Sequence, residues 1–411
     1  MSANQPQSLG AAAVRPLRQP VQLNWGRLNA AAVILLIIGI GGFIGGLMTG
    51  HNQRVWEVWL VDFLFFTGIA QGGVVVSAAF YLTQARWGGV TQYRLAEAFA
   101  WFLPLSLLLF LGVLFGREFI FPWILHPVPR KAMWLNVPFM FTRDYIALFV
   151  MTAVSMFFMS LSRGVRAQAW VQQFSDIEMP PPALRRLAPI LAILYCVAYT
   201  LLSWDLIMSL SPLWHSTLFG WWYFATDFWS GIVAMAFTAV ILRELLGPNT
   251  SVSHPEVLHD LGKMIFAFSI FWMYTAFAQY LVIWYGDIPS ETFFLLVRLW
   301  HWPWLPMGWI APILIWVVPF VVLLGVRPKR TPYILGTVAL LGLIGVWDLD
   351  YMLVVPSITP DVLPLGWVEA CISLGFLGAF ILCAVPGLKL TVNAAVTQAT
   401  PTLTELGARM E

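Results

Sequence analysis

The sequence predicts an all-α polytopic membrane protein, and both its composition and its hydrophobic pattern lead to that fold class. Of the 411 residues, 60% are hydrophobic and only 10% are charged, whereas soluble domains are about 45–50% apolar and about 25% charged. A soluble fold could not hide so much apolar surface, because folding still leaves about a quarter of it in water. The net charge of +2 is too small to indicate a nucleic-acid binder.

Ten apolar segments are long enough to cross a bilayer as helices, which takes about 20 residues each. None alternates polar and apolar residues over about 10 positions, as the strands of a membrane barrel do. The predicted membrane helices cover residues 30–50, 57–83, 96–121, 139–162, 187–210, 216–243, 261–285, 306–326, 332–355 and 364–386. Residues 1–28 and 387–411 are predicted to be terminal tails.

The first apolar segment, residues 30–50, is predicted to remain in the protein as a helix. A cleaved signal peptide, the alternative, would have an apolar core of about 7–15 residues, which is shorter than this segment. Its glycines at 41, 42, 45, 46 and 50 form overlapping small-xxx-small spacings, which let a second helix approach closely. We expect that helix to belong to this chain, with a dimer face as the alternative.

The distribution of Lys and Arg predicts that both termini are cytoplasmic. Most of the 22 Lys and Arg residues fall in the segments on the same side as the termini, for example Arg163, Arg243 and Lys329. Positively charged loops are retained on the cytoplasmic side of a membrane. An even number of helices agrees with this orientation.

A weak internal repeat is visible in the sequence. The fifth predicted helix ends in Trp204-Asp205-Leu206, and the ninth ends in Trp347-Asp348-Leu349. The second carries Asp62-Phe63, and the sixth carries Asp227-Phe228. A shift of four helices keeps the chain direction, as in the parallel repeats of some transport proteins. Chance recurrence in a tryptophan-rich chain is the alternative.

This repeat predicts the domain organisation. Helices two to five, residues 57–210, would form one four-helix bundle, and helices six to nine, residues 216–355, would form the second. The helices at 30–50 and 364–386 would be peripheral. A short segment, Glu291–Trp302, is too short to span the bilayer and is predicted to be an interfacial helix.

Residues able to hold a redox cofactor are missing from the predicted bundle interior. A haem b with two histidine ligands needs two histidines facing each other inside the bundle. The six histidines lie in loops or near helix ends: His51, His126, His215, His254, His259 and His301. Three cysteines are too few for an iron–sulfur cluster, and no glycine-rich nucleotide-binding motif is present. We therefore expect no metal and no redox cofactor to be bound by this chain.

Acidic residues inside the predicted helices are the strongest functional signal. An Asp at the membrane centre costs about 2.5–3.5 kcal/mol on insertion scales, and such acids are frequent in proton relays. The proton-path candidates near the outer end are Asp62, Asp144, Asp205, Asp227, Asp348 and Asp350. A polar cluster that only fixes helix packing is the alternative. Arg143 is adjacent to Asp144 and cannot face it on a helix, so it is predicted to pair with an acid on another helix.

Further proton-path candidates lie toward the inner end. Glu97 begins the third predicted helix, and His259 and Lys263 share one face at the start of the seventh. Solvated helix ends are the alternative interpretation of these three residues. Gln279 lies between the two ends. Gln71 is about half a turn out of phase with Asp62 on the second helix, so these two do not line one wall.

Two stretches, Trp204–Gly220 and Ala278–Pro289, resemble the NrfD-like family of polysulfide-reductase membrane subunits. Within that family, the resemblance is to the F subunits of bacterial alternative complex III, and it covers nearly all of residues 30–386. The predicted repeat matches the two four-helix bundles of the family. No motif for a quinol site can be matched residue by residue in this chain.

The resemblance implies a membrane subunit of a quinol-oxidising electron-transfer complex in the bacterial cytoplasmic membrane. The implied partners are a sister NrfD-like membrane subunit together with multihaem cytochrome c and iron–sulfur subunits, which would hold the haem c and the iron–sulfur clusters. Menaquinol or ubiquinol would be the reductant, and lipid would surround this chain. The chain itself would be a proton conduit and scaffold. The alternatives are a secondary transporter and a purely structural membrane anchor.

Overall fold

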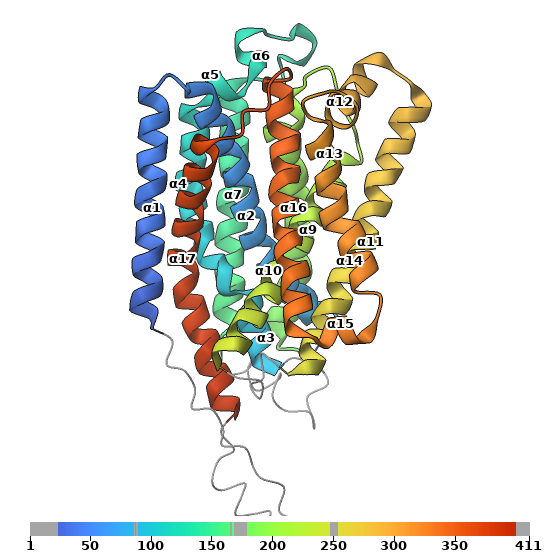
Figure 1. Cartoon of the computed structure of the whole chain (residues 1–411). Helices are drawn as coiled ribbons and strands as arrows, with labels where there is room; N and C mark the ends of the chain where they lie inside the picture. The colour runs from blue at the N-terminus through green and yellow to red at the C-terminus, as the bar shows by residue number, and fades with distance from the viewer. Residues whose placement is uncertain are drawn as a thin grey trace, which may run out of the picture.

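The computed structural model describes residues 24–85, 87, 89–164, 167, 179–246 and 254–399. These residues form helices without any β-strand, and ten of the helices are long and apolar enough to cross a membrane. This confirms the predicted all-α polytopic fold. Figure 1 shows the helices standing side by side as one bundle, in which α1 begins and α17 ends at the same lower end.

Among the first nine membrane spans, seven are single continuous helices, and the third and the eighth are interrupted. The continuous ones are α1 (Trp25–Met48), α2 (Asn52–Leu82), α7 (Val137–Ser162), α9 (Pro182–Leu206), α10 (Phe219–Leu246), α11 (Pro255–Gly286) and α16 (Pro332–Ile358), and the tenth span is α17 (Trp367–Ala399). The third span consists of α3 (Gly89–Ala96), η1 (Ala98–Phe102) and α4 (Leu103–Phe115). The eighth consists of α13 (Leu305–Pro312), the π-helical turn η4 (Ile313–Val317) and α14 (Val318–Val322).

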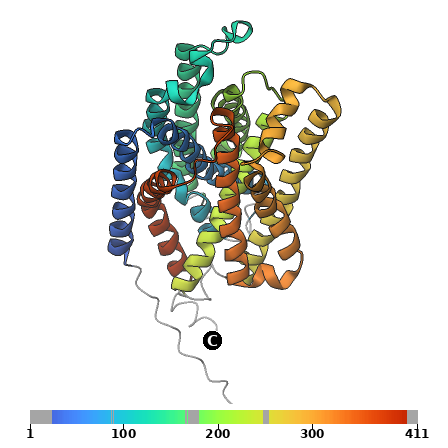
Figure 2. The same cartoon turned by 45° about the horizontal axis from the view of Figure 1, so that its top comes forward.

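Short helices connect these spans at the two ends of the bundle. They are α5 (Arg117–Ile120), α6 (Pro122–Leu125), η2 (Pro129–Lys131), η3 (Met208–Leu210), α12 (Pro289–Leu299) and α15 (Val326–Arg330). The expected interfacial segment at 291–302 is mostly α12, which lies near the upper end (Figure 1). In Figure 2, α11 and α13 lie on the side of the bundle opposite to α1.

Several of the predicted boundaries are wrong, and three of them have a clear physical reason. The third span begins at Gly89 rather than 96, because Arg94 and Glu97 are buried inside the bundle instead of ending the helix. The predicted tail at 387–411 begins as helix, because α17 continues to Ala399 and buries Val392 and Ala395. The predicted tail at 1–28 ends earlier, because the Asn24 side chain caps α1 by accepting a hydrogen bond from the Arg27 amide. Residues 1–23 and 400–411 lie outside the described part.

The centre of the fold is the crossing of α2 and α10, which glycines allow. A Cβ atom at Gly72 would lie 2.1 Å from the carbonyl oxygen of Asp227, and one at Gly231 would lie 2.5 Å from the carbonyl carbon of Gly72. Small residues at such crossings let two backbones approach closely. Both α2 and α10 also contact α9 and α16. The division into two four-helix bundles stays a prediction.

The glycines of α1 pack against α17 of the same chain. A Cβ atom at Gly39 would lie 2.2 Å from the Cα atom of Gly375, and one at Gly42 would lie 2.3 Å from the Cβ atom of Cys371. This confirms the expected contact within the chain. Helix α1 contacts mainly α17, whereas α17 also packs against α2, α3 and η1, so the tenth helix is the more deeply embedded of the two predicted peripheral helices.

Candidate functional site

Arg143 and Asp205 form a buried ion pair between α7 and α9, near the upper end of the bundle. The Arg143 Nε atom donates to Asp205 Oδ2 at 2.7 Å, and Arg143 Nη2 donates to Oδ1 at 2.5 Å. Trp134 adds a third donor, from its Nε1 atom to Oδ1 at 2.8 Å, and the Arg143 guanidinium lies 3.8 Å from the centre of the Trp134 ring. The prediction that Arg143 pairs with an acid on another helix is confirmed.

Asp144, the neighbour of Arg143 on α7, has very different surroundings. Its side chain is fully buried, and its carboxyl group interacts with that of Asp205. Within the described residues, no hydrogen-bond donor reaches either of its carboxyl oxygens. Burying a carboxylate without donors is costly, whereas a carboxylic acid at this position can donate a hydrogen bond to Asp205. The two acids are therefore arranged so that a proton can lie between them.

Polar side chains continue down the interface of α2 and α7. Gln71 Nε2 donates to Ser155 Oγ at 3.0 Å, and both side chains are buried. Above this pair, the space toward Asp144 contains the buried Thr67 and Thr152. Eleven residues separate Asp144 from Ser155, which is a rise of about 16 Å along α7. Water molecules in this gap would be needed to connect the two groups by hydrogen bonds.

Glu97 lies at the lower end of the same polar interface, where α3 meets η1. It is fully buried, and its Oε1 atom accepts a hydrogen bond from Ser77 Oγ at 2.9 Å. Arg163 Nε and Arg94 Nη1 lie 3.6 and 3.8 Å from its Oε2 atom. The alternative of a solvated helix end is wrong for Glu97, because its side chain is fully buried and the span continues beyond it as η1.

We name this set of side chains the first-repeat polar file. It includes acids near the upper and the lower end of the bundle and the polar side chains that lie between them on α2 and α7. Its members are Gln71, Ser77, Glu97, Arg143, Asp144, Ser155 and Asp205.

The acids of α10 and α16 form a second group, in the upper half of the bundle. Tyr223 donates its hydroxyl to Asp350 Oδ1 at 3.3 Å. Asp227, Asp348 and Asp350 each keep one buried carboxyl oxygen without a hydrogen-bond partner among the described residues. Asp227 also approaches α2 so closely that a Cβ atom at Gly68 would lie 2.3 Å from its Oδ1 atom.

Asp62 is separate from both groups. Its carboxyl group accepts hydrogen bonds from Trp347 Nε1 on α16 at 2.8 Å and from Ser373 Oγ on α17 at 2.9 Å. It thus connects three helices and has both oxygens occupied. Gln71 instead faces α7, as the phase of α2 predicts. The position of Asp62 favours the packing interpretation for this one acid.

His259 and Lys263 lie near the lower end of α11. Lys263 is exposed and its ammonium group pairs with Asp260 on its own helix at 2.5 Å. In the part of the chain that the structure describes, neither side chain is hydrogen-bonded or ion-paired with Glu97. The structure therefore does not bring these two candidates into the first-repeat polar file.

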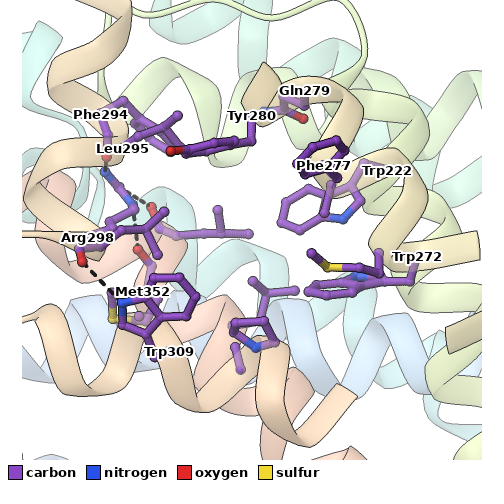
Figure 3. A pocket seen from close by; sticks show the side chains of 18 of the residues that line it. Trp222, Trp272, Phe277, Gln279, Tyr280, Phe294, Leu295, Arg298, Trp309 and Met352 are labelled. Atoms are coloured by element: carbon purple, nitrogen blue, oxygen red, sulfur yellow. Dashed lines mark hydrogen bonds between the residues drawn. The ribbon is translucent and has the colours of Figure 1, made fainter. Parts of the chain in front are cut away.

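Gln279 lines a cavity of about 410 Å³ between α10, α11, α12, α13 and α16 (Figure 3). The same cavity contains Arg298 of α12, which sequence reasoning missed. A single arginine in a short interfacial helix is ordinarily expected to contact lipid headgroups, but Arg298 is 6% exposed. The one sequence feature that could have indicated burial of Arg298 is its position within Phe293–Trp300, a segment that is otherwise apolar.

Two acids near the upper end of α2 and α17 were also missed. Glu369 accepts two hydrogen bonds from Arg54, at 2.9 and 2.6 Å, which ties α2 to α17. Glu57 accepts hydrogen bonds from Gln53 and Thr359. Both acids lie close to predicted helix ends, so burial was not predictable from their position in the sequence. Both occur where the chain packs its upper loops against the bundle.

The described residues include no group of three or more His, Cys, Asp or Glu side chains placed to hold a metal ion. A scan against protein-family models finds no match to this chain, and a search of curated proteins finds no matching sequence.

Proposed function

We propose that this chain is a membrane subunit of a quinol-oxidising electron-transfer complex, and that its first-repeat polar file conducts protons. The complex is inferred from the resemblance of Trp204–Gly220 and Ala278–Pro289 to the F subunits of alternative complex III. Electron transfer would take place in partner subunits that carry haem c and iron–sulfur clusters. This chain would supply the proton route and a scaffold in the bacterial cytoplasmic membrane.

One observation carries the proton proposal: buried acids lie near both ends of a group of neighbouring helices (η1, α2, α7 and α9), with buried polar side chains between them. Glu97 is at one end and Asp144 with Asp205 is at the other. Intramembrane acids that face the bundle interior are characteristic of proton relays. A polar cluster that only fixes helix packing would not need buried acids near both ends of the bundle.

The chemistry assigns a different role to each end. Glu97 would exchange protons with the lower side, and Arg94 and Arg163 would stabilise its ionised form. The Arg143 guanidinium donates to both carboxyl oxygens of Asp205 and to neither oxygen of Asp144, so Asp144 would be the acid that carries the exchangeable proton. Water between Thr67, Thr152 and the Gln71–Ser155 pair would carry the proton across the gap, because amides and hydroxyls alone do not span it.

The interruptions of the helices favour a conduit over a secondary transporter. Transporter sites are typically formed by broken helices in matching positions of two repeats. Here the broken spans are the third (α3, η1 and α4) and the eighth (α13, η4 and α14). A shift of four helices would match the third span to α11, which is continuous from Pro255 to Gly286.

The complex part of the proposal is tested by purifying the chain through a C-terminal tag in a mild detergent. Haem c absorbance and large partners in stoichiometric amounts are the expected result. A colourless particle that contains this chain alone would contradict membership of a redox complex.

The conduit part is tested at the middle of the file. Gln71→Leu removes the polar side chain that meets Ser155 and is expected to slow quinol-driven proton release from vesicles by about ten-fold or more. The control is Glu118→Gln, on an exposed side chain at the upper end. Normal proton release by an assembled Gln71→Leu complex would exclude this route and leave the chain as a structural anchor.

A further inference from the structure

A short helix at the lower end of the bundle carries three basic residues. This helix, α15, follows the eighth span and lies between α14 and α16, at the end where α1 begins (Figure 1). Its basic residues are Arg327, Lys329 and Arg330. Helix α15 packs against α11, and a Cβ atom at Gly262 of α11 would lie 2.9 Å from Lys329 Cγ. The stem of Lys329 therefore crosses α11 at this glycine.

Positive charges outnumber negative ones where α15 meets the start of α11. The two acids of this part of α11 already have basic partners. Arg330 Nη2 lies 2.8 Å from Glu256 Oε1, and Lys263 Nζ lies 2.5 Å from Asp260 Oδ1. The other two basic residues, both on α15, form no ion pair with any acid among the described residues. Two positive charges are therefore left over at this corner of the bundle.

Lys329 is the unusual one of these two, because it is buried. It is 8% exposed, and its ammonium group lies 4.9 Å from the centre of the Phe266 ring. In the part of the chain that the structure describes, no side chain or carbonyl oxygen accepts a hydrogen bond from it. Burial and the neighbouring Lys263 lower the pKa of Lys329. A buried ammonium group without a partner is costly, so an anion at this position would stabilise it.

A ligand can reach this ammonium group from the membrane side. Its nitrogen is not sealed in the interior, as the unpaired oxygens of Asp144 are. The segment that directly precedes Lys329 carries apolar side chains that face outward. Val321, Leu324 and Val326 are 64%, 66% and 54% exposed, and they lie at the end of α14, in the connection and at the start of α15. A charged group bound at Lys329 would thus have apolar surface of the eighth span beside it.

We propose that Lys329 and Arg327 bind the headgroup of an anionic phospholipid whose acyl chains lie along α14. Lys329 would hold the phosphate group as a point charge, and Arg327, which is exposed, would add the second positive charge. Basic pockets between membrane helices bind anionic headgroups in this way. A soluble phosphate compound or an acidic peptide would make no use of the outward apolar side chains at 321–326.

This site goes beyond the proposed function and does not rest on it. The first-repeat polar file includes none of its residues. It also gives a different role to the lower end of α11, where Lys263 lies beside Lys329 rather than beside Glu97.

The test is photolabelling of membranes that contain the full-length chain. The two probes are phosphatidylglycerol and phosphatidylcholine that carry the same diazirine-bearing acyl chain. Peptide mapping is expected to place the phosphatidylglycerol label within 313–335, and phosphatidylcholine should label this segment about five-fold less or weaker still. An excess of unlabelled phosphatidylglycerol should remove the label, whereas an excess of inorganic phosphate should leave it in place.

Variants locate the headgroup. Lys329→Gln and Arg327→Gln should each reduce labelling by phosphatidylglycerol about five-fold, because each removes one positive charge from an anionic headgroup. Labelling by phosphatidylcholine should stay the same. Arg327 is exposed, so its substitution tests the site without disturbing the packing of α15 on α11. The matched control is Lys389→Gln, on an exposed lysine at the lower end of α17, which should leave the label at 313–335 unchanged.

Three results would overturn the proposal. Equal labelling by the two probes would indicate ordinary lipid contact without selection of the headgroup. Loss of the label in excess inorganic phosphate would assign the basic residues to a soluble anion. Unchanged labelling by phosphatidylglycerol in both Lys329→Gln and Arg327→Gln, with each variant present at the level of the parent protein, would remove these residues from the site. None of these results depends on proton release, so they leave the conduit proposal unaffected.

Discussion

Two adjacent acids of the first-repeat polar file show how strongly local surroundings separate residues of the same type. Asp205 accepts hydrogen bonds from Arg143 and Trp134, while Asp144 receives none from the described residues. The contact between the Arg143 guanidinium and the Asp205 carboxyl group ties α7 to α9. Because burying a carboxylate without donors is costly, an acid in such surroundings is favoured in its neutral form.

This contrast predicts effects of very different size for the same substitution. Asp205→Asn should destabilise the protein by about 3 kcal/mol, because it leaves the mostly buried Arg143 charge, 12% exposed, without its acidic partner. Asp144→Asn should change stability by less than about 1 kcal/mol, since no donor loses its acceptor. The midpoint temperature of unfolding in detergent measures both, with Asp361→Asn on an exposed loop residue as the control. Equal losses for Asp205→Asn and Asp144→Asn would contradict these roles.

Sequence reasoning at this scale succeeded where helix geometry alone decided the outcome. Arg143 cannot face Asp144, and Asp62 cannot face the same way as Gln71, so their separation was predictable. The partner of Arg143 was not predictable, because five acids other than Asp144 were predicted at a similar depth. Arg298 was missed because it donates to backbone carbonyl oxygens of α12 and α16. Every residue has such a carbonyl group, so no residue type in the sequence indicates these acceptors.

At the scale of helices, glycines determine which pairs come together. Gly72 of α2 meets the backbone of α10, whereas Gly41 of α1 has no neighbouring atom within 4 Å of a Cβ placed there. Both are helical glycines in apolar segments, so the sequence alone does not separate them. Only the position of the second helix distinguishes a glycine required for contact from one that faces lipid.

Gly72→Ala is therefore expected to force α2 and α10 apart and to lower the stability by about 2–4 kcal/mol, as overpacking does in tight interiors. Gly41→Ala should be neutral or slightly stabilising, because alanine favours the helix by up to about 1 kcal/mol. Thermal unfolding in detergent and the amount of folded protein in membranes check this pair. Similar behaviour of the two variants would argue against the close crossing of α2 and α10.

The helices themselves were predictable because about 20 apolar residues have few alternatives to spanning a bilayer. Their boundaries were less predictable where charges are buried. Arg94 and Glu97 indicate a helix end by their polarity, yet they pair with each other inside the bundle. Lys389 likewise suggests a tail after residue 386, although α17 continues past it.

For the whole molecule, the two predicted repeats differ in their lower halves. The first places Ser77 and Glu97 below its central polar pair. In the second, Ser230 and Ser269 donate to carbonyl oxygens of their own helices. The described acids below Asp227 in the second repeat are Glu244, Glu256 and Asp260, and none of them is buried as Glu97 is. Within the described residues, only the first repeat therefore has buried acids near both ends of the bundle.

The measurement that tests this account most directly is the number of protons released per electron by the assembled complex in vesicles. Glu97→Gln keeps the size of the side chain and removes its titratable group, so the ratio should fall by at least half. Asp348→Asn, in the second repeat, and Glu118→Gln, on the exposed upper surface, should leave the ratio unchanged. A normal ratio in Glu97→Gln, or an equal loss in Asp348→Asn, would contradict a proton route confined to the first repeat.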